Sequence, residues 1–212
     1  MTQTIEQIEY SQSSAIIKFT DGKQFEVKLE IPSALKISSK QDIENELFEK
    51  IMHESQKFEC EKKALQYIST RMKSESETVN YLKKKKFNIE IIDQVVNRLK
   101  ELNYINDNEF AGKFVDYKMR TKTIGLNLIK SELILKGIKR DIIEEVLSPL
   151  RLLKRDDELL ELALKKFEAV KLKKNPLEKV KMFLISRGFD FDEISPALRI
   201  ISSRLKADDD FE

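Results

Sequence analysis

The side chains that could carry out chemistry are few in this sequence, and they do not cluster. The only histidine, His53, and the only cysteine, Cys60, are seven residues apart without a further His or Cys. A metal site needs several ligands at close spacing, and a nucleophilic cysteine needs a neighbouring base. The five glycines form neither a GxxxxGKS/T loop nor a GxGxxG loop for phosphate. The sequence therefore predicts no metal site, no cofactor and no enzymatic activity.

Positive charge is the remaining chemical signal, and it is concentrated in the middle of the chain. The formal net charge is only +2, but residues 61–150 contain 18 basic and 13 acidic residues. Between Lys113 and Arg140, eight basic residues accompany only Asp116 and Glu132. This asymmetry predicts an anionic partner for the middle region. The alternative interpretation is that the lysines only solvate helix surfaces.

A sequence repeat predicts the elements that position these charges. Segments starting at Tyr81, Glu132 and Phe183 align without gaps at an offset of 51 residues. Each segment ends with apolar residues at i, i+3, i+4 and i+7, which is the buried stripe of an amphipathic helix. The aligned columns are Ile92, Ile143 and Ile194; Val95, Val146 and Ala197; Val96, Leu147 and Leu198; and Leu99, Leu150 and Ile201. Because a third helical pattern precedes each segment, we predict three tandem three-helix repeats.

The second helix of each repeat carries signals for its end. Gly137 and Gly188 occupy the same column, where a left-handed residue would follow the helix. Lys86 replaces this glycine in the first repeat, so we predict either a strained lysine or a different cap there. The preceding column is always cationic, which suits the negative end of the helix dipole.

Signals for helix starts are also present. Ser74 and Glu77 have capping-box spacing before the second helix of the first repeat. In the third repeat, Asn175, Pro176 and Glu178 predict a similar start with proline at the first helical position.

The first 60 residues differ from the repeats. Apolar and polar residues alternate on both sides of Asp21-Gly22, which predicts a β-hairpin, and a further strand is expected around Ile5 to Tyr10. The expected fold class is mainly α with a small β-region. We predict an N-terminal hairpin region at 1–38, a linking helix at 39–56, three-helix repeats at 57–105, 106–151 and 152–206, and an acidic tail at 207–212.

Three stretches resemble the RecX family of bacterial recombination regulators: ALQYISTRMKSESETVNYLKKKKF, LKELNYINDNEFAGKFV and IGLNLIKSELILKGI. The resemblance implies an elongated, curved arrangement of three-helix repeats and no catalytic residues. It also implies a partner, RecA, whose filament on single-stranded DNA would be bound and whose ATPase and strand exchange would be inhibited. Such a protein would act in DNA repair, homologous recombination and the SOS response. We expect a cytoplasmic protein, because no signal-peptide run or 18-residue apolar stretch occurs. We also expect a monomer.

Cations along one face are the candidates for docking to the filament or to DNA phosphate. The candidates are Arg71, Lys83 and Lys84 in the first repeat, and Lys113, Lys118, Arg120, Lys122, Lys130 and Arg140 in the second. We expect the aromatics Tyr67, Tyr81, Tyr104, Phe110 and Phe114 to pack in the core rather than stack on bases.

Two alternative functions remain at this point. One is a direct DNA-binding protein of helix-turn-helix type without a RecA partner, and weak direct binding to single- or double-stranded DNA is compatible with both functions. The third helices argue against a reading role, because IEIIDQVVNRLKEL and DIIEEVLSPL are acidic or neutral. The other is a helical scaffold, whose usual repeat periods are shorter than the 51 residues found here.

Overall fold

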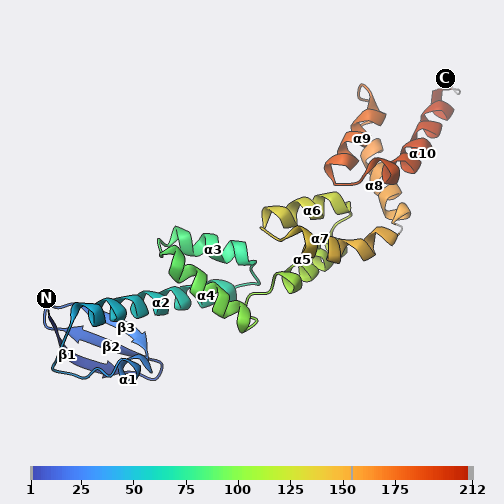
Figure 1. Ribbon diagram of the computed structural model, residues 1–212. Coiled ribbons are helices and arrows are strands. Elements are labelled where there is room, and N and C mark those ends of the chain that lie inside the picture. Colours follow the sequence, from blue (N-terminus) through green and yellow to red (C-terminus); the bar gives the residue numbers. More distant parts are fainter. Residues whose placement is uncertain (1, 154, 210–212) are drawn as a thin grey trace. The chain divides into compact units, whose positions relative to one another are not determined.

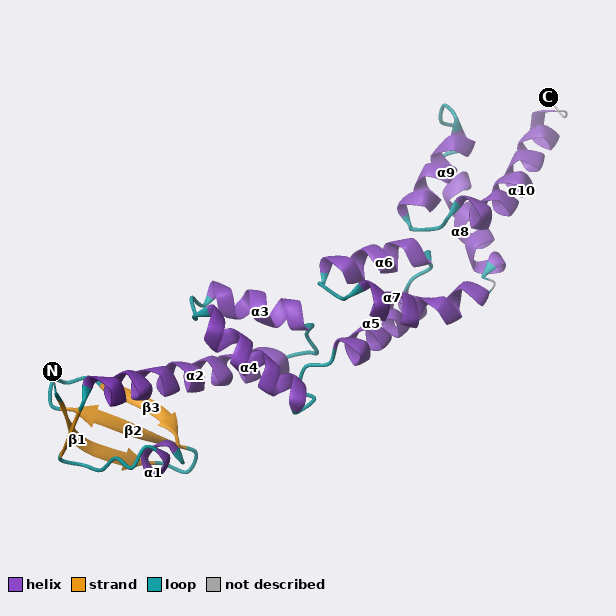
Figure 2. Cartoon of the chain, viewed as in Figure 1, coloured by secondary structure: helices purple, strands orange, loops and turns teal. Residues whose placement is uncertain are grey.

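Helices form most of the structure, as predicted, and strands occur near the N-terminus of the described residues (Figure 2). The computed structural model describes residues 2–153 and 155–209. The chain divides into two units, Met1–Ile105 and Asn106–Glu212, each with its own buried clusters (Figure 1). We name them unit 1 and unit 2 and describe each by itself.

Unit 1 begins with an antiparallel sheet in the order β3-β2-β1-β4. The predicted hairpin at Asp21-Gly22 joins β2 to β3, and Gly22 adopts a φ of +86° that glycine tolerates without steric cost. The additional strand near the N-terminus is confirmed as β1. The bounds are β1 Gln3–Tyr10, β2 Ser14–Phe19, β3 Gln24–Lys28 and β4 Gln41–Ile43, with a short helix α1 at Ile31–Ala34 between β3 and β4.

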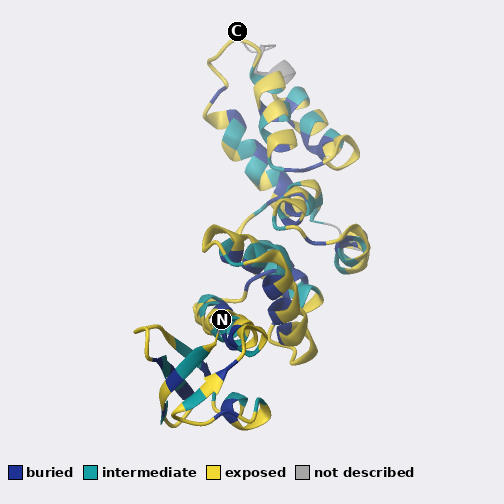
Figure 3. Cartoon of the chain, turned by 60° about the vertical axis from the view of Figure 1, so that its left-hand side comes forward, coloured by how far each residue is buried: buried dark blue, intermediate teal, exposed yellow. Residues whose placement is uncertain are grey.

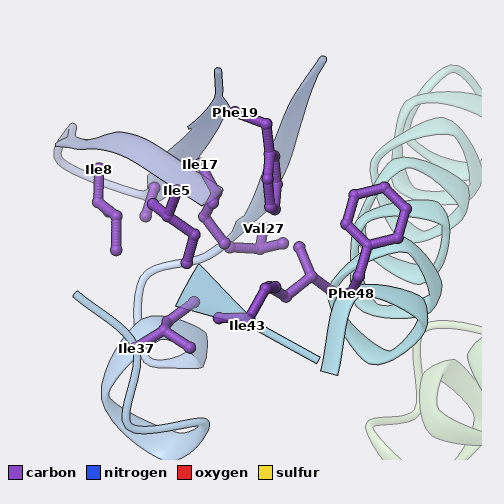
Figure 4. Close-up of a cluster of buried hydrophobic side chains, with 10 residues drawn as sticks. Ile5, Ile8, Ile17, Phe19, Val27, Ile37, Ile43 and Phe48 are labelled. Atoms are coloured by element: carbon purple, nitrogen blue, oxygen red, sulfur yellow. The ribbon is translucent and has the colours of Figure 1, made fainter. Parts of the chain in front are cut away.

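One long helix, α2 (Asn45–Ser69), covers the sheet and then continues into the first repeat. Its start buries Phe48 against the sheet, where the Phe19 and Phe48 rings meet edge to face at 5.1 Å (Figure 4). Farther along, Cys60 and Ala64 enter a second core. The predicted linking helix at 39–56 is therefore wrong in its bounds: it contains β4, and α2 crosses its end because no Pro or Gly interrupts the helical sequence.

The first repeat combines the second half of α2 with α3 (Glu75–Lys84) and α4 (Ile89–Glu101). The predicted capping box starts α3: Ser74 Oγ accepts from the Glu77 backbone N–H at 3.1 Å, and the Ser74 N–H donates to Glu77 Oε2 at 3.2 Å. The stripe of α4 is buried as predicted, and Figure 3 shows buried residues on the inner helix faces.

Unit 2 contains the second and third repeats, each around its own apolar cluster. The predicted tail at 207–212 is wrong in part, since the last helix extends to Asp209 and residues 210–212 lie outside the described part. The helices are α5 Asp107–Thr121, α6 Leu126–Leu135, α7 Arg140–Leu147, α8 Asp156–Glu168, α9 Pro176–Ser186 and α10 Phe191–Asp209, with a 3₁₀ turn η1 at Ser148–Leu152.

The second helix ends in the same way in all three repeats. The left-handed φ is +66° at Lys86, +76° at Gly137 and +86° at Gly188. In each repeat the following residue donates back across the turn: Phe87 N–H to the Leu82 carbonyl and its two counterparts. This is the Schellman pattern, so the first of the two predicted possibilities, a strained lysine, is confirmed.

The predicted start of α9 is only partly confirmed. Pro176 is the first helical residue, but the Asn175 side chain makes no capping hydrogen bond. Asn175 has a left-handed backbone with φ +52°, whereas a side-chain N-cap normally has extended backbone. The capping box expected there is therefore wrong.

Backbone contacts join the second and third repeats within unit 2. The Gly125 N–H donates to the Arg187 carbonyl at 2.9 Å, and the Asn127 N–H donates to the Gly188 carbonyl at 3.1 Å. A Cβ added at Gly125 would overlap the Gly188 backbone, and a Cβ added at Gly188 would overlap the Leu128 backbone. The two repeats therefore meet at a distance that only glycine permits.

Candidate interaction surfaces

Arg71 lies between α2 and α3 and holds this corner together. Its guanidinium donates to both Glu77 carboxylate oxygens, at 3.0 and 3.3 Å, and to the Met72 carbonyl at 2.9 Å. The hydrogen bond that Arg71 donates to Glu77 raises the pKa of the Arg71 guanidinium. Because Glu77 also caps α3, the structure uses this candidate docking residue in an intramolecular clasp.

Lys83 and Lys84 lie in the last turn of α3 with exposed side chains. Among the described residues they make no ion pair. Their aligned positions in α6 are Ile134, which is 48% exposed, and Leu135, which is 87% exposed. The end of the second helix is therefore cationic in the first repeat and apolar in the second. The gap-free alignment of the repeats places these residues in the same columns, but it does not indicate that Ile134 and Leu135 are surface residues.

Three candidates in the second repeat are engaged by carboxylates of unit 2. Lys113 pairs with Glu109 one turn earlier at 2.6 Å. Lys118 of α5 pairs with Glu132 of α6, and only 13% of its side chain is exposed. The third pair joins Lys130 of α6 to Glu144 of α7 at 2.6 Å.

These pairs have a structural role that sequence spacing did not indicate. The two interhelical pairs connect α5 to α6 and α6 to α7. Glu144 also accepts from Arg151 at 2.6 Å, and its bonds to Lys130 and Arg151 lower the pKa of its carboxyl group. A lysine held in this way presents less unbalanced charge to a partner than a lysine without a carboxylate nearby.

The other three candidates of unit 2, Arg120, Lys122 and Arg140, are exposed. Within the described ranges none of them makes an ion pair. Arg120 and Lys122 lie at the end of α5, where Lys122 is the C-cap residue, and Arg140 begins α7. Together with Lys83 and Lys84 of unit 1, they are the candidates whose charge is available to an anionic partner.

Cations cover several of the aromatic rings. Tyr67 and Tyr81 stack with centroids 4.1 Å apart and planes 3° apart, with Lys73 over Tyr67 and Lys85 over Tyr81 at 4.3 and 5.7 Å. Their outer faces are thus taken by cations rather than left open for bases.

The other aromatics divide between core and surface. Phe110 is buried, and Phe114 packs beside it with centroids 6.1 Å apart. The prediction of core packing is wrong for Tyr104, which lies in the turn after α4 and is 62% exposed.

Cys60 is fully buried in the core of the first repeat, and burial together with Glu59 and Glu61 raises the pKa of its thiol to about 12. The thiolate needed for nucleophilic attack is therefore strongly disfavoured there. His53 lies on the exposed side of α2, with its Nδ1 3.9 Å from Glu54 Oε1. Within residues 2–153 and 155–209, no group of three or more His, Cys, Asp or Glu side chains is arranged to hold a metal ion.

Comparison with known proteins assigns two of the repeats. Residues 60–99 match the family model for the first three-helix domain of RecX, and residues 106–147 match that for the second. The chain is 30% identical over 165 residues to the regulatory protein RecX of Clostridium perfringens. The aligned stretch covers 76% of this chain and 77% of that protein. This chain belongs to the RecX family.

Other RecX proteins match over different lengths. The match to RecX of Bacillus pumilus is 37% identical over 142 residues, and it spans 64% of this chain but only about half, 52%, of the longer relative. Across 91% of this chain and 96% of its relative, the identity to RecX of Caldanaerobacter subterraneus is 28%.

Solved RecX structures share the fold. A crystal structure of regulatory protein RecX has a TM-score of 0.76 at 21% identity and covers 91% of this chain and 97% of that chain. RecX from Lactobacillus salivarius has a TM-score of 0.61 at 25% identity and covers 69% and 97% of the two chains. The family is thus one of regulatory proteins. In the described part of this member, no helix is long and apolar enough to cross a membrane.

Proposed function

We propose that this RecX-family chain binds RecA and its filament on single-stranded DNA and inhibits the filament's ATPase and recombination activity. It would act in the cytoplasm as a monomer that modulates DNA repair, homologous recombination and the SOS response. The observation that carries the proposal is the match of two consecutive three-helix domains to RecX, which is a family of regulatory proteins.

The exposed cations support docking to a nucleoprotein filament. Such a filament carries phosphate and carboxylate charge, so an approaching cationic surface gains attraction and a faster association rate. The residues proposed to supply it are Lys83, Lys84, Arg120, Lys122 and Arg140. Arg71, Lys118 and Lys130 are assigned to holding helices in place and Lys113 to a pair within α5, because each is paired with a carboxylate of its own unit.

The apolar end of α6 supports a protein contact beside this charge. Ile134 and Leu135 are exposed, and Lys139 and Arg140, which follow the turn at Gly137, also have exposed side chains. Exposed apolar side chains next to cations suit a protein surface with an apolar hollow and an acidic rim. We propose that this end of α6 contacts the RecA protein rather than DNA.

The test is the DNA-dependent ATPase of RecA with this chain present at less than one copy per RecA. We expect inhibition by the wild type. Reversing two unpaired cations, as Arg120→Glu with Lys122→Glu, should raise the half-inhibitory concentration several-fold and reduce its salt dependence. The matched control is Lys36→Glu with Lys40→Glu, which changes the net charge equally at exposed lysines of unit 1.

The outcomes separate the role of the chain from the role of the residues. No inhibition by the wild type, at any salt concentration that preserves filaments, would contradict the proposed function. Equal inhibition by both double variants and the wild type would contradict only the assignment of Arg120 and Lys122.

A further inference from the structure

The third repeat contains a second concentration of positive charge, separate from the candidates above. Between Lys165 and Arg187 eight basic residues accompany only two acidic ones, Glu168 and Glu178. The region from Lys113 to Arg140 has the same numbers of basic and acidic residues over a longer stretch, so the positive charge is denser here. The net charge of residues 151–212 does not reveal this cluster, because acidic residues at the start of α8 and near the C-terminus balance its positive charge.

The two carboxylates of this segment are engaged by lysines outside the centre of the cluster. Glu168 pairs with Lys171 at 2.6 Å, and Glu178 pairs with Lys181 at 3.5 Å. No carboxylate among the described residues pairs with Lys166, Lys173, Lys174 or Lys179. The charge of these four lysines is therefore not balanced by an ion pair in the part of the chain that the structure describes.

These four lysines line one open groove of about 890 Å³. The groove lies between the end of α8, the following turn and the outer face of α9. Glu178 is the single acidic residue among its lining residues. The N-terminus of α9 adds partial positive charge, since the Asn175 side chain does not cap it.

The groove floor favours a ligand recognised by charge rather than by base or side-chain readout. Phe183 lies in the floor, but Lys166 covers its ring at 4.8 Å and Arg187 covers it at 5.1 Å. A ring flanked by two cations is a poor platform for a stacked base. The groove is also wide open to solvent, whereas a bound peptide would need an enclosed apolar pocket for an anchoring side chain.

We propose that this groove binds the sugar–phosphate backbone of DNA without sequence preference. Lys173 and Lys174 in the turn, Lys166 from α8 and Lys179 from α9 would each neutralise backbone phosphate. Binding would be driven by release of counterions and would therefore weaken steeply with salt. This inference does not depend on the proposed function, because the contact requires no RecA.

The test measures fluorescence anisotropy of a labelled oligothymidine and of a labelled duplex with the full chain, without RecA. We expect binding at low salt. The logarithm of the association constant should fall linearly with the logarithm of the salt concentration. Lys173→Glu with Lys174→Glu should weaken binding at least about tenfold and lower the salt slope by roughly 1.4 for the single strand or 1.8 for the duplex. The neutral pair Lys173→Gln with Lys174→Gln should give a smaller loss in the same direction.

The control is again Lys36→Glu with Lys40→Glu, which should keep the wild-type salt slope. A loss confined to one DNA form would support the groove and identify the form it holds. The proposal is overturned if the wild type binds neither form at low salt, or if groove and control variants lose affinity equally. It is also overturned if polyglutamate displaces DNA at an equal concentration of charge, because the groove would then be a site for acidic protein.

Discussion

The ends of α3 and α9 have the same backbone but are under different constraints. Lys86 and Gly188 both adopt left-handed conformations, at φ +66° and +86°, and both complete a Schellman turn. At Lys86 the side chain is exposed, so only the backbone strain of an L-residue opposes the conformation. At Gly188 the backbone of α6 approaches so closely that no Cβ fits. The glycine column thus reflects a shared turn in all three repeats and an additional packing contact in the third.

This comparison explains why the column could be predicted but its meaning could not. The repeated turn is local, because residues within six positions of one another determine its bonds and conformation. The contact of Gly188 with Leu128 joins residues 60 positions apart. A pattern within one repeat contains no information about which neighbour packs against it.

The largest expected effect is that of Gly188→Ala. The substitution combines left-handed strain with overlap against the Leu128 backbone, so it should destabilise unit 2 by roughly 3 kcal/mol or more. We expect the melting temperature of unit 2 to fall by roughly 10 °C or more, as measured by circular dichroism.

Cys60 offers a local readout for the other unit. Its thiol is buried in unit 1 with a pKa of about 12, so it should alkylate slowly at pH 8 while unit 1 is folded. In the Gly188→Ala variant, the Cys60 thiol should remain protected from alkylation at temperatures where unit 2 has already unfolded. Loss of protection in the same transition would show that the two units unfold together and would contradict their separate stability.

Gly125→Ala should have the next largest effect. It tests the close contact between the second and third repeats without the strain of a left-handed backbone. Gly125 has an ordinary φ of −79°, so only the overlap with the Gly188 backbone opposes a methyl group. We expect a loss of about 1–3 kcal/mol in the free energy of unfolding of unit 2, measured by urea denaturation.

Gly112→Ala is the matched control in the same unit. Gly112 lies inside α5, and an added Cβ would meet nothing within 4 Å. It should stabilise unit 2 by roughly 0.5–1 kcal/mol, because alanine loses less backbone entropy in a helix. A gain in stability from both substitutions would show that the close contact between Gly125 and Gly188 does not exist.

A smaller difference is expected between the starts of α3 and α9. Ser74→Ala removes a cap whose hydroxyl accepts from Glu77, and should cost unit 1 about 1 kcal/mol. Asn175→Gly removes no side-chain cap bond and relieves left-handed strain, so it should leave unit 2 equally or more stable. Thermal melts monitored separately for each unit would check this, and a clear loss for Asn175→Gly would contradict the uncapped start of α9.

Sequence reasoning predicted what depends on neighbours along the chain. The hairpin at Asp21-Gly22 and the capping box at Ser74 are local patterns, and both appear in the structure. The predicted stripe of the third helices is buried throughout in α4, but Val146, Leu150 and Leu198 are only half-buried, and Leu150 lies in η1 beyond the end of α7. It did not predict the strand β4, which pairs with β1 almost 40 residues away. Nor did it predict that α2 would serve both the sheet and the first repeat, because only the tertiary fold places Phe48 and Cys60 in different cores.

The candidate site shows the same limit. Composition located a basic region, but it could not separate lysines that pair with carboxylates of the chain from lysines that make no ion pair. Lys130 is paired with Glu144, which is 14 residues away, whereas Lys122 makes no ion pair in the described chain. Long-range pairs of this kind depend on how α6 packs on α7. The exposed cations are therefore a shorter set than the sequence alone indicated.

The smallest expected effect is that of Lys86→Gly, which would make the first repeat match the other two. Glycine reaches φ +66° without the penalty that an L-residue incurs. It also gives the unfolded chain more conformational entropy, which offsets part of this gain in stability. We therefore expect unit 1 to gain up to about 1 kcal/mol in urea denaturation. Lys86→Ala removes the same charge next to Lys83, Lys84 and Lys85 but keeps the Cβ, so it should give little or no gain. If both variants stabilise equally, repulsion within the lysine run, rather than the left-handed backbone, is what the first repeat tolerates at this turn.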